Sequence, residues 1–171
     1  MKPYYENPGQ NLPVFTALFE RVGLDWAVIG GIAAVERRPD FRETVDVDFV
    51  VSEMAHLEER LNELQPKRLR VLRESGGTPY LIQGETSDGM HFDIYIASIE
   101  FEKAVLATKD ENHFASAEAI IVYKLMAMRP HDIDDIRSIL ARPAIGSLDI
   151  AFIEHWAEEC GVLDRWREFA T

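Results

Sequence analysis

Two aspartates inside an apolar stretch are the first residues whose types and spacing point to chemistry. Asp46 and Asp48 lie in VDVDFVV, residues 45–51. Side chains alternate between the faces of a strand, so Thr44 shares one face with the two aspartates, whereas Val47 and Phe49 share the other. Neighbouring carboxylates repel unless a cation lies between them, and Mg²⁺ prefers oxygen ligands. The spacing favours a metal-binding face; the alternative is two solvated acids on a half-exposed strand.

A third carboxylate has a similar setting. Asp93 lies between Phe92 and Ile94 in MHFDIYIA, residues 90–97, so it shares a strand face with His91 and Tyr95. If this strand pairs beside the first, Asp93 completes a three-carboxylate cluster. Such a cluster binds one or two divalent ions and supports phosphoryl or nucleotidyl transfer.

A glycine pair fits the same chemistry. Gly30 and Gly31 follow the apolar segment DWAVI and open a helical segment. Backbone N–H groups there can approach a triphosphate without an intervening Cβ, at the positive end of a helix. Alone, a strand–Gly–Gly–helix junction is a weak signal, but it gains specificity beside the aspartates.

Periodicity predicts the elements that must position these residues. Apolar alternation and turn residues predict strands, and a spacing of three to four residues predicts helices. The expected strands are 25–29, 44–52, 68–75, 79–85 and 90–97, and the expected helices are 12–23, 32–38, 52–66 and a helical series from Ser116 onward. We therefore expect an α/β (α+β) fold, a mixed β-sheet flanked by helices and followed by a C-terminal helical segment. Residues 1–115 form the expected core, and 116–171 pack on it as part of one compact unit.

Composition bounds the function. The chain has 171 residues, a net charge of −12 and a single cysteine, Cys160, which rules out an internal disulfide and a cysteine-based zinc site. No apolar run approaches a membrane span, and the start lacks a secretory signal, so we expect a cytoplasmic protein without a membrane partner. The acidic balance argues against wholesale electrostatic capture of nucleic acid.

Two local basic clusters stand against that balance. One comprises Arg37, Arg38 and Arg42, and the other lies in PKRLRVLR, residues 66–73. Alternation puts Arg68 and Arg70 on one strand face. This edge could face tRNA or a triphosphate, or it could be a charged edge strand that avoids aggregation.

The motifs taken together resemble the nucleotidyltransferase superfamily typified by DNA polymerase β, with VIGG, VDVDF and FDI as its apolar-Gly-Gly, Asp-x-Asp and later Asp elements. The sequence of residues 30–51 is more similar still to a bacterial branch of this superfamily that contains the abortive-infection nucleotidyltransferase toxins. There, Gly-Gly is followed by Arg-x-Thr-x-Asp-x-Asp, matched here from Arg42 to Asp48. Those relatives also carry a serine-capped helix with a lysine, then an arginine and Asp-x-x-Asp, matched by Ser116, Lys124, Arg129, Asp132 and Asp135.

This resemblance implies a nucleotidyltransferase fold and a reaction that uses Mg²⁺ (or Mn²⁺) and a nucleoside triphosphate such as ATP. Asp46 and Asp48 would hold the metal ions, and Asp93 would bind the second ion and assist deprotonation of the attacking hydroxyl. The implied nucleotide-binding residues are Gly30, Gly31, Arg42, Thr44, Lys124, Asp132 and Asp135. Among these, Lys124 would reach the triphosphate, while Asp132 and Asp135 would position its helix or contact the nucleotide.

Less specific interpretations stay open beside these roles. Lys124 could be a solvated residue at a helix edge, and Asp132 and Asp135 could favour a helix N-terminus electrostatically. The whole chain could be a catalytically silent nucleotide-binding or toxin-neutralising module, or a structural interaction protein. The acceptor is open among tRNA or other RNA, protein and small molecules, and a cognate antitoxin is a further expected partner.

Overall fold

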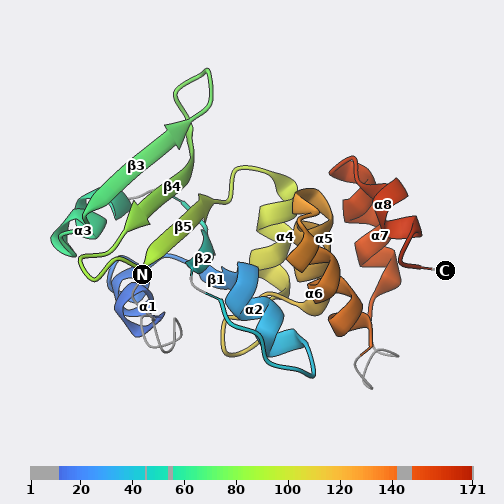
Figure 1. Ribbon diagram of the computed structural model, residues 1–171. Helices are drawn as coiled ribbons and strands as arrows, with labels where there is room; N and C mark the ends of the chain where they lie inside the picture. Colours follow the sequence, from blue (N-terminus) through green and yellow to red (C-terminus); the bar gives the residue numbers. More distant parts are fainter. Residues whose placement is uncertain (1–11, 45, 54–55, 142–147, 171) are drawn as a thin grey trace.

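The computed structural model describes residues 12–44, 46–53, 56–141 and 148–170. In chain order, its elements are α1 (Leu12–Arg21), β1 (Trp26–Ile29), α2 (Gly30–Arg37), β2 (Asp46–Val51), α3 (Leu57–Glu63), β3 (Arg68–Arg73), β4 (Pro79–Glu85), β5 (His91–Ile96), α4 (Glu100–Thr108), α5 (Ala117–Ala127), α6 (Pro130–Leu140), α7 (Ile150–Glu159) and α8 (Leu163–Arg167). The β3–β4–β5 part of the sheet lies at one end of the molecule, and α4–α8 lie at the other (Figure 1).

The sheet is mixed, and its strand order places distant parts of the chain side by side. The order is β1-β2-β5-β4-β3. The β2–β5 pair is parallel, and the other neighbouring strands are antiparallel. In the parallel pair Asp48 lies opposite Asp93, and Asp46 lies opposite His91. Cross-strand partners share a face of the sheet, so the register brings the predicted acids to one face.

The opposite face of the sheet holds the core. Phe49, Ile94 and Ile82 lie in register on β2, β5 and β4, and all three are fully buried. Helix α1 covers them because Phe15 and Phe19 pack their rings 5.4 and 5.1 Å from the ring of Phe49. The alternation VDVDFV thus separates a packed face from a polar one, which fixes the direction of the aspartates.

The expected mixed sheet, its flanking helices and the C-terminal helical segment are confirmed. Ser116 caps α5, as expected, by accepting a hydrogen bond from the Ala119 N–H at 3.2 Å. The helix expected over 52–66 is shorter, since α3 begins at Leu57 after His56, whose φ of 57° is left-handed. Helix α4 was not predicted. Helix α5 packs against α2, so the C-terminal segment contacts the core, and a division at residue 115 stays a prediction.

None of the helices among residues 12–44, 46–53, 56–141 and 148–170 combines the length and apolarity that a membrane crossing requires.

Candidate active site

A cavity of about 780 Å³ opens on the polar face of the sheet. Its volume falls within the roughly 300–1,000 Å³ of small-molecule sites. It is lined from β2, β4, β5, the start of α2, the 42–44 segment, α5 and residues 129–131. The lining residues are Gly31, Arg42, Glu43, Thr44, Asp46, Asp48, Gln83, His91, Phe92, Asp93, Tyr95, Lys124, Arg129 and His131.

The three aspartates line this cavity together. Burial, followed by the nearby charges of Asp93 and Asp46, raises the pKa of Asp48 to about 7, against the opposing effect of a hydrogen bond from the Gly31 N–H. Burial also raises the pKa of Asp93, whose carboxylate accepts hydrogen bonds from the Gln83 side chain at 3.2 and 3.3 Å. The site therefore concentrates negative charge where water solvates it poorly.

The donor set has the chemistry of a divalent-cation site, but its side chains are not yet arranged as one. Carboxylate oxygens suit Mg²⁺ or Mn²⁺, and a cation would offset the burial and the repulsion that together raise the pKa of Asp48. Among the described residues, no group of three or more His, Cys, Asp or Glu side chains is close enough to hold one ion. Asp46, Asp48 and Asp93 would have to draw closer together around an ion.

The glycine pair makes room for side chains of the site. Gly30 has a φ of +65°, and a methyl group there would overlap the Asp48 carboxylate. A methyl group on Gly31 would overlap the Thr44 hydroxyl. Because the Gly31 N–H also hydrogen-bonds Asp48, the turn between β1 and α2 holds that carboxylate in place. A phosphate contact by either glycine stays a prediction.

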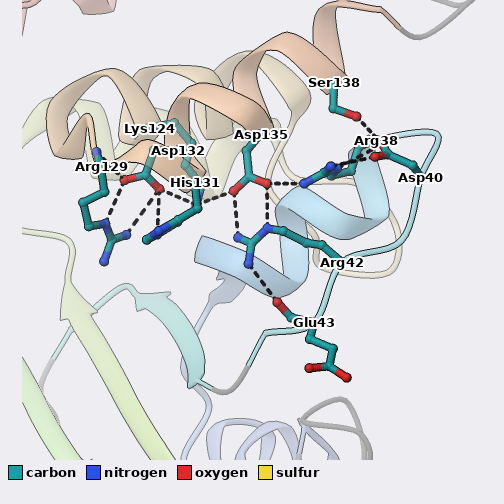
Figure 2. Close-up of polar contacts among 10 residues, drawn as sticks. All are labelled: Arg38, Asp40, Arg42, Glu43, Lys124, Arg129, His131, Asp132, Asp135 and Ser138. Atoms are coloured by element: carbon teal, nitrogen blue, oxygen red, sulfur yellow. Dashed lines mark hydrogen bonds and ion pairs between the residues drawn. The ribbon is translucent and has the colours of Figure 1, made fainter.

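Behind the cavity, a network of charged side chains joins the segment after α2 to helices α5 and α6 (Figure 2). Its centre is Asp135, which is fully buried. Arg42 donates two hydrogen bonds to this carboxylate, from Nε and Nη2, at 2.7 Å each. Arg38 donates a third at 2.6 Å, and the Lys124 ammonium lies 2.8 Å away. Asp135 therefore fixes cations from two distant parts of the chain.

Asp132 is the second buried acid of the network, and it is also fully inaccessible to solvent. It accepts from Lys124 Nζ at 2.8 Å and from Arg129 Nε at 2.7 Å. Burial opposes ionisation of Asp132, but the hydrogen bonds from Arg129 and Lys124 outweigh it and hold its pKa at about 2. The carboxylate therefore stays charged and anchors both cations.

The structure brings most of the predicted site residues to the cavity, but not all of them. Gly31, Arg42, Thr44, Asp46, Asp48, Asp93 and Lys124 line it. Gly30, Asp132 and Asp135 do not: the acids lie behind the cavity and contact its cations. The alternative that Lys124 is a solvated helix-edge residue is wrong, since only 3% of it is exposed.

Sequence reasoning missed several lining residues. Gln83 and Arg129 both line the cavity. Strand alternation places Tyr95 on the face of Asp93, so it could have been included. Gln83 could not be found in this way, because its place beside Asp93 depends on the β4–β5 register.

Comparison with known proteins identifies the fold. No protein-family model and no curated protein sequence matches the chain. Among solved structures, the antibiotic-resistance factor ANT(2″)-Ia matches with a TM-score of 0.60 and 18% identity, over 94% of this chain and 92% of that one.

Two further structures agree. The lincosamide antibiotic adenylyltransferase LnuA, solved with lincomycin bound, matches with a TM-score of 0.54 and 16% identity, over 77% of this chain and 96% of its own. An antigenic nucleotidyltransferase-like protein from Paracoccidioides brasiliensis matches with a TM-score of 0.52 and 19% identity, over 91% and 87%. The chain thus has the nucleotidyltransferase fold of the DNA polymerase β type.

Proposed function

We propose that this protein is a divalent-cation-dependent nucleotidyltransferase that moves a nucleoside monophosphate from a nucleoside triphosphate to an acceptor hydroxyl. One observation carries the proposal. Asp48 and Asp93 lie opposite each other on adjacent strands, Asp46 lines the same cavity, and the cations Lys124 and Arg42 line it too. Carboxylates beside cations suit a triphosphate, which needs a metal ion as well as positive charge.

Lys124 is the proposed contact for the triphosphate. Its ammonium group has three N–H donors, and Asp132 and Asp135 each lie 2.8 Å from Nζ. One donor is left for the cavity, which Lys124 lines. The two aspartates would thus act by holding the ammonium in position rather than by touching the nucleotide.

Arg42 is proposed to work in the same way. Asp135 accepts two hydrogen bonds from it, and Nη1 donates to the backbone oxygen of Glu43 at 3.0 Å. These contacts fix the guanidinium beside Gly31 and Thr44, where we propose that the phosphates of the nucleotide bind. Preorganised cations of this kind stabilise charge that develops during transfer without further reorganisation.

Asp46, Asp48 and Asp93 would hold the divalent cation, Mg²⁺ or Mn²⁺. Bound there, the cation would supply positive charge to the attacking and leaving oxygens. Gln83 orients Asp93 through its amide N–H, and Gly31 orients Asp48. We propose that Asp93 also takes up the proton of the acceptor hydroxyl, because burial raises its pKa and so makes its carboxylate a better proton acceptor.

The finer identity rests on resemblance. We propose ATP as a substrate and a relationship to the abortive-infection toxins, with a cognate antitoxin as partner, because the Arg-x-Thr-x-Asp-x-Asp and Lys…Asp-x-x-Asp patterns are complete. The acceptor belongs to RNA, protein or a small molecule. Structural neighbours named as an antibiotic-resistance factor and an antibiotic adenylyltransferase favour testing small molecules beside RNA.

The test is transfer of label. Purified protein and Mg²⁺ are incubated with each nucleoside triphosphate, labelled at the α- or the γ-phosphate, and with tRNA, protein extract or small hydroxyl compounds. We expect transfer of the α-label alone, lost in Asp93→Asn and retained in the exposed control Asp164→Asn. Transfer of the γ-label would indicate a kinase instead. Triphosphate binding without any transfer would favour the catalytically silent module.

A further inference from the structure

The polar face of the sheet continues beyond the three aspartates. In the register of β2, β5, β4 and β3, Asp48 lies opposite Asp93, Asp93 opposite Gln83, and Gln83 opposite Arg70. A parallel row runs from Asp46 through His91 and Glu85 to Arg68. Residues opposite one another share a face. Arg68 and Arg70 therefore extend the active-site face to the outer edge of the sheet, where β3 lies (Figure 1).

These two arginines are exposed and unpaired. Within the described part of the chain, neither side chain makes a hydrogen bond or an ion pair. The flanking cations differ: Lys67 lies 3.5 Å from Glu85, and Arg73 lies 3.8 Å from Glu58 on α3. Protection of an edge strand against aggregation needs only charge, which Lys67 and Arg73 already supply. Edge protection therefore leaves Arg68 and Arg70 without an explanation.

The spacing suits an extended anionic ligand. Two strand spacings of ~4.8 Å place the backbone of β3 about 10 Å from that of β5. Duplex nucleic acid rises ~3.4 Å per nucleotide of a strand, so about three nucleotides would cover that distance. Gln83, between Asp93 and Arg70, is neutral, and Glu85, beside Arg68, is paired with Lys67. The row ending at Arg70 is thus the more favourable track for a phosphate backbone.

We propose that the β4–β3 face, carried by Arg68 and Arg70, is the acceptor-binding surface, and that the acceptor is a single strand of RNA whose end hydroxyl reaches Asp93. This inference rests on the proposed nucleotidyl transfer. It explains how a chain of net charge −12 takes a polyanion, because two exposed arginines supply local positive charge on the face that leads to the site.

The test is the salt dependence of RNA binding. A fluorescein-labelled short single-stranded RNA with a free terminal ribose hydroxyl is titrated with wild type and with the double variant Arg68→Gln/Arg70→Gln, between about 50 and 200 mM salt. Each phosphate contact on a single strand contributes ~0.7 to the slope of log affinity against log salt, so the slope should fall by about 1.4. The matched control is Arg137→Gln/Arg167→Gln, which removes two exposed charges elsewhere and should leave the slope unchanged.

A second measurement separates this surface from the catalytic proposal. In the transfer assay, Arg68→Gln/Arg70→Gln should raise KM for RNA and leave KM for the nucleoside triphosphate unchanged. If no acceptor is labelled but the RNA-binding slope still falls in this variant alone, the transferase proposal fails and the surface stands. An equal slope in wild type and variant overturns the surface. Labelling of a protein or a cationic small molecule that the variant leaves unchanged also overturns it.

Discussion

Replacing Asp48 by asparagine should stabilise the metal-free protein at alkaline pH while abolishing nucleotidyl transfer. The pKa of Asp48 is raised from 3.8 to about 7 by burial and by the charges of Asp93 and Asp46. The unfolded chain therefore releases this proton near pH 4, and the folded chain releases it near pH 7. Across that window the folded state binds more protons, so the carboxyl group lowers stability progressively as pH rises.

The magnitude follows from the width of the window. About three pH units at ~1.4 kcal/mol each give at most about 4 kcal/mol above pH 7. For a chain of this size, 1 kcal/mol moves Tm by ~2–4 °C, so the gain has an upper bound of roughly 8–16 °C. The asparagine oxygen can still accept from the Gly31 N–H. Removing one charge relieves the repulsion but also removes a ligand that a divalent cation needs.

The assay is thermal unfolding followed by circular dichroism at pH 8 and pH 4, in buffer with a chelator. We expect a higher Tm for Asp48→Asn at pH 8 and little difference at pH 4. The control Asp164→Asn removes a charge from a side chain that is 93% exposed, and its Tm should match wild type at both pH values. Saturating Mg²⁺ should raise the wild-type Tm and leave that of Asp48→Asn unchanged. An Asp48→Asn Tm at or below wild type at pH 8 would refute the reasoning.

Three further predictions concern the surroundings of the site. Asp135→Asn leaves three cations facing a neutral group in a buried position, so it should cost ~3–5 kcal/mol and lower Tm by roughly 6–20 °C. Asp40→Asn, in the same network but with a side chain 59% exposed, should leave Tm near wild type, and equal effects of the two would contradict the role of burial. Gly30→Ala should lose transfer activity and ~1–2 kcal/mol of stability, because an L-residue is strained at a φ of +65° and the new methyl group displaces the Asp48 carboxylate. The control is Gly76→Ala, in which the new methyl group meets open space. If Gly30→Ala kept its transfer activity, the proposed need for a glycine beside the Asp48 carboxylate would be wrong. Because the pKa of Asp132 is lowered to about 2, its ionised carboxylate contributes fully to stability above pH 4, and this contribution is lost as pH falls from about 4 to 2. The free energy of unfolding measured in urea should therefore depend less on pH across that range in Asp132→Asn.

The local pattern predicted strands β1 to β5, most of the helices though not α4, and the face on which the acids lie. Alternation in β2 and β5 separates Asp48 and Asp93 from Phe49 and Ile94, because one face of each strand must be buried. The serine cap of α5 also follows from local residue types. Alternation does not show which strands are neighbours in the sheet. The pairing of β2 with β5 was therefore an assumption of the sequence analysis and not a prediction from it.

The charged network lay further beyond sequence reasoning. Asp132 and Asp135 are fully buried, yet on an isolated helix they look like acids that favour its N-terminal turn. Arg38 and Arg42, which pair with Asp135, lie about a hundred residues earlier in the chain. Only the folded structure shows which cation meets which acid. Periodicity likewise could not reveal that Lys124 is buried, since its burial depends on α6 folding back over α5.

The parallel contact between β2 and β5 also bears on when activity appears during folding. Among the described strands, β1 and β2 pair with each other, and β3, β4 and β5 form a meander of their own. The strands within each group pair with partners nearby in the chain. Pairing β2 with β5 joins the two groups, and it requires the long segment between these strands to be closed into a loop. Asp48 and Asp93 lie on opposite sides of that junction, so neither half holds a complete set of acids. A chain that stalls with its halves formed but undocked would have native-like strands and no active site, and recovery of transfer activity would time the docking step itself.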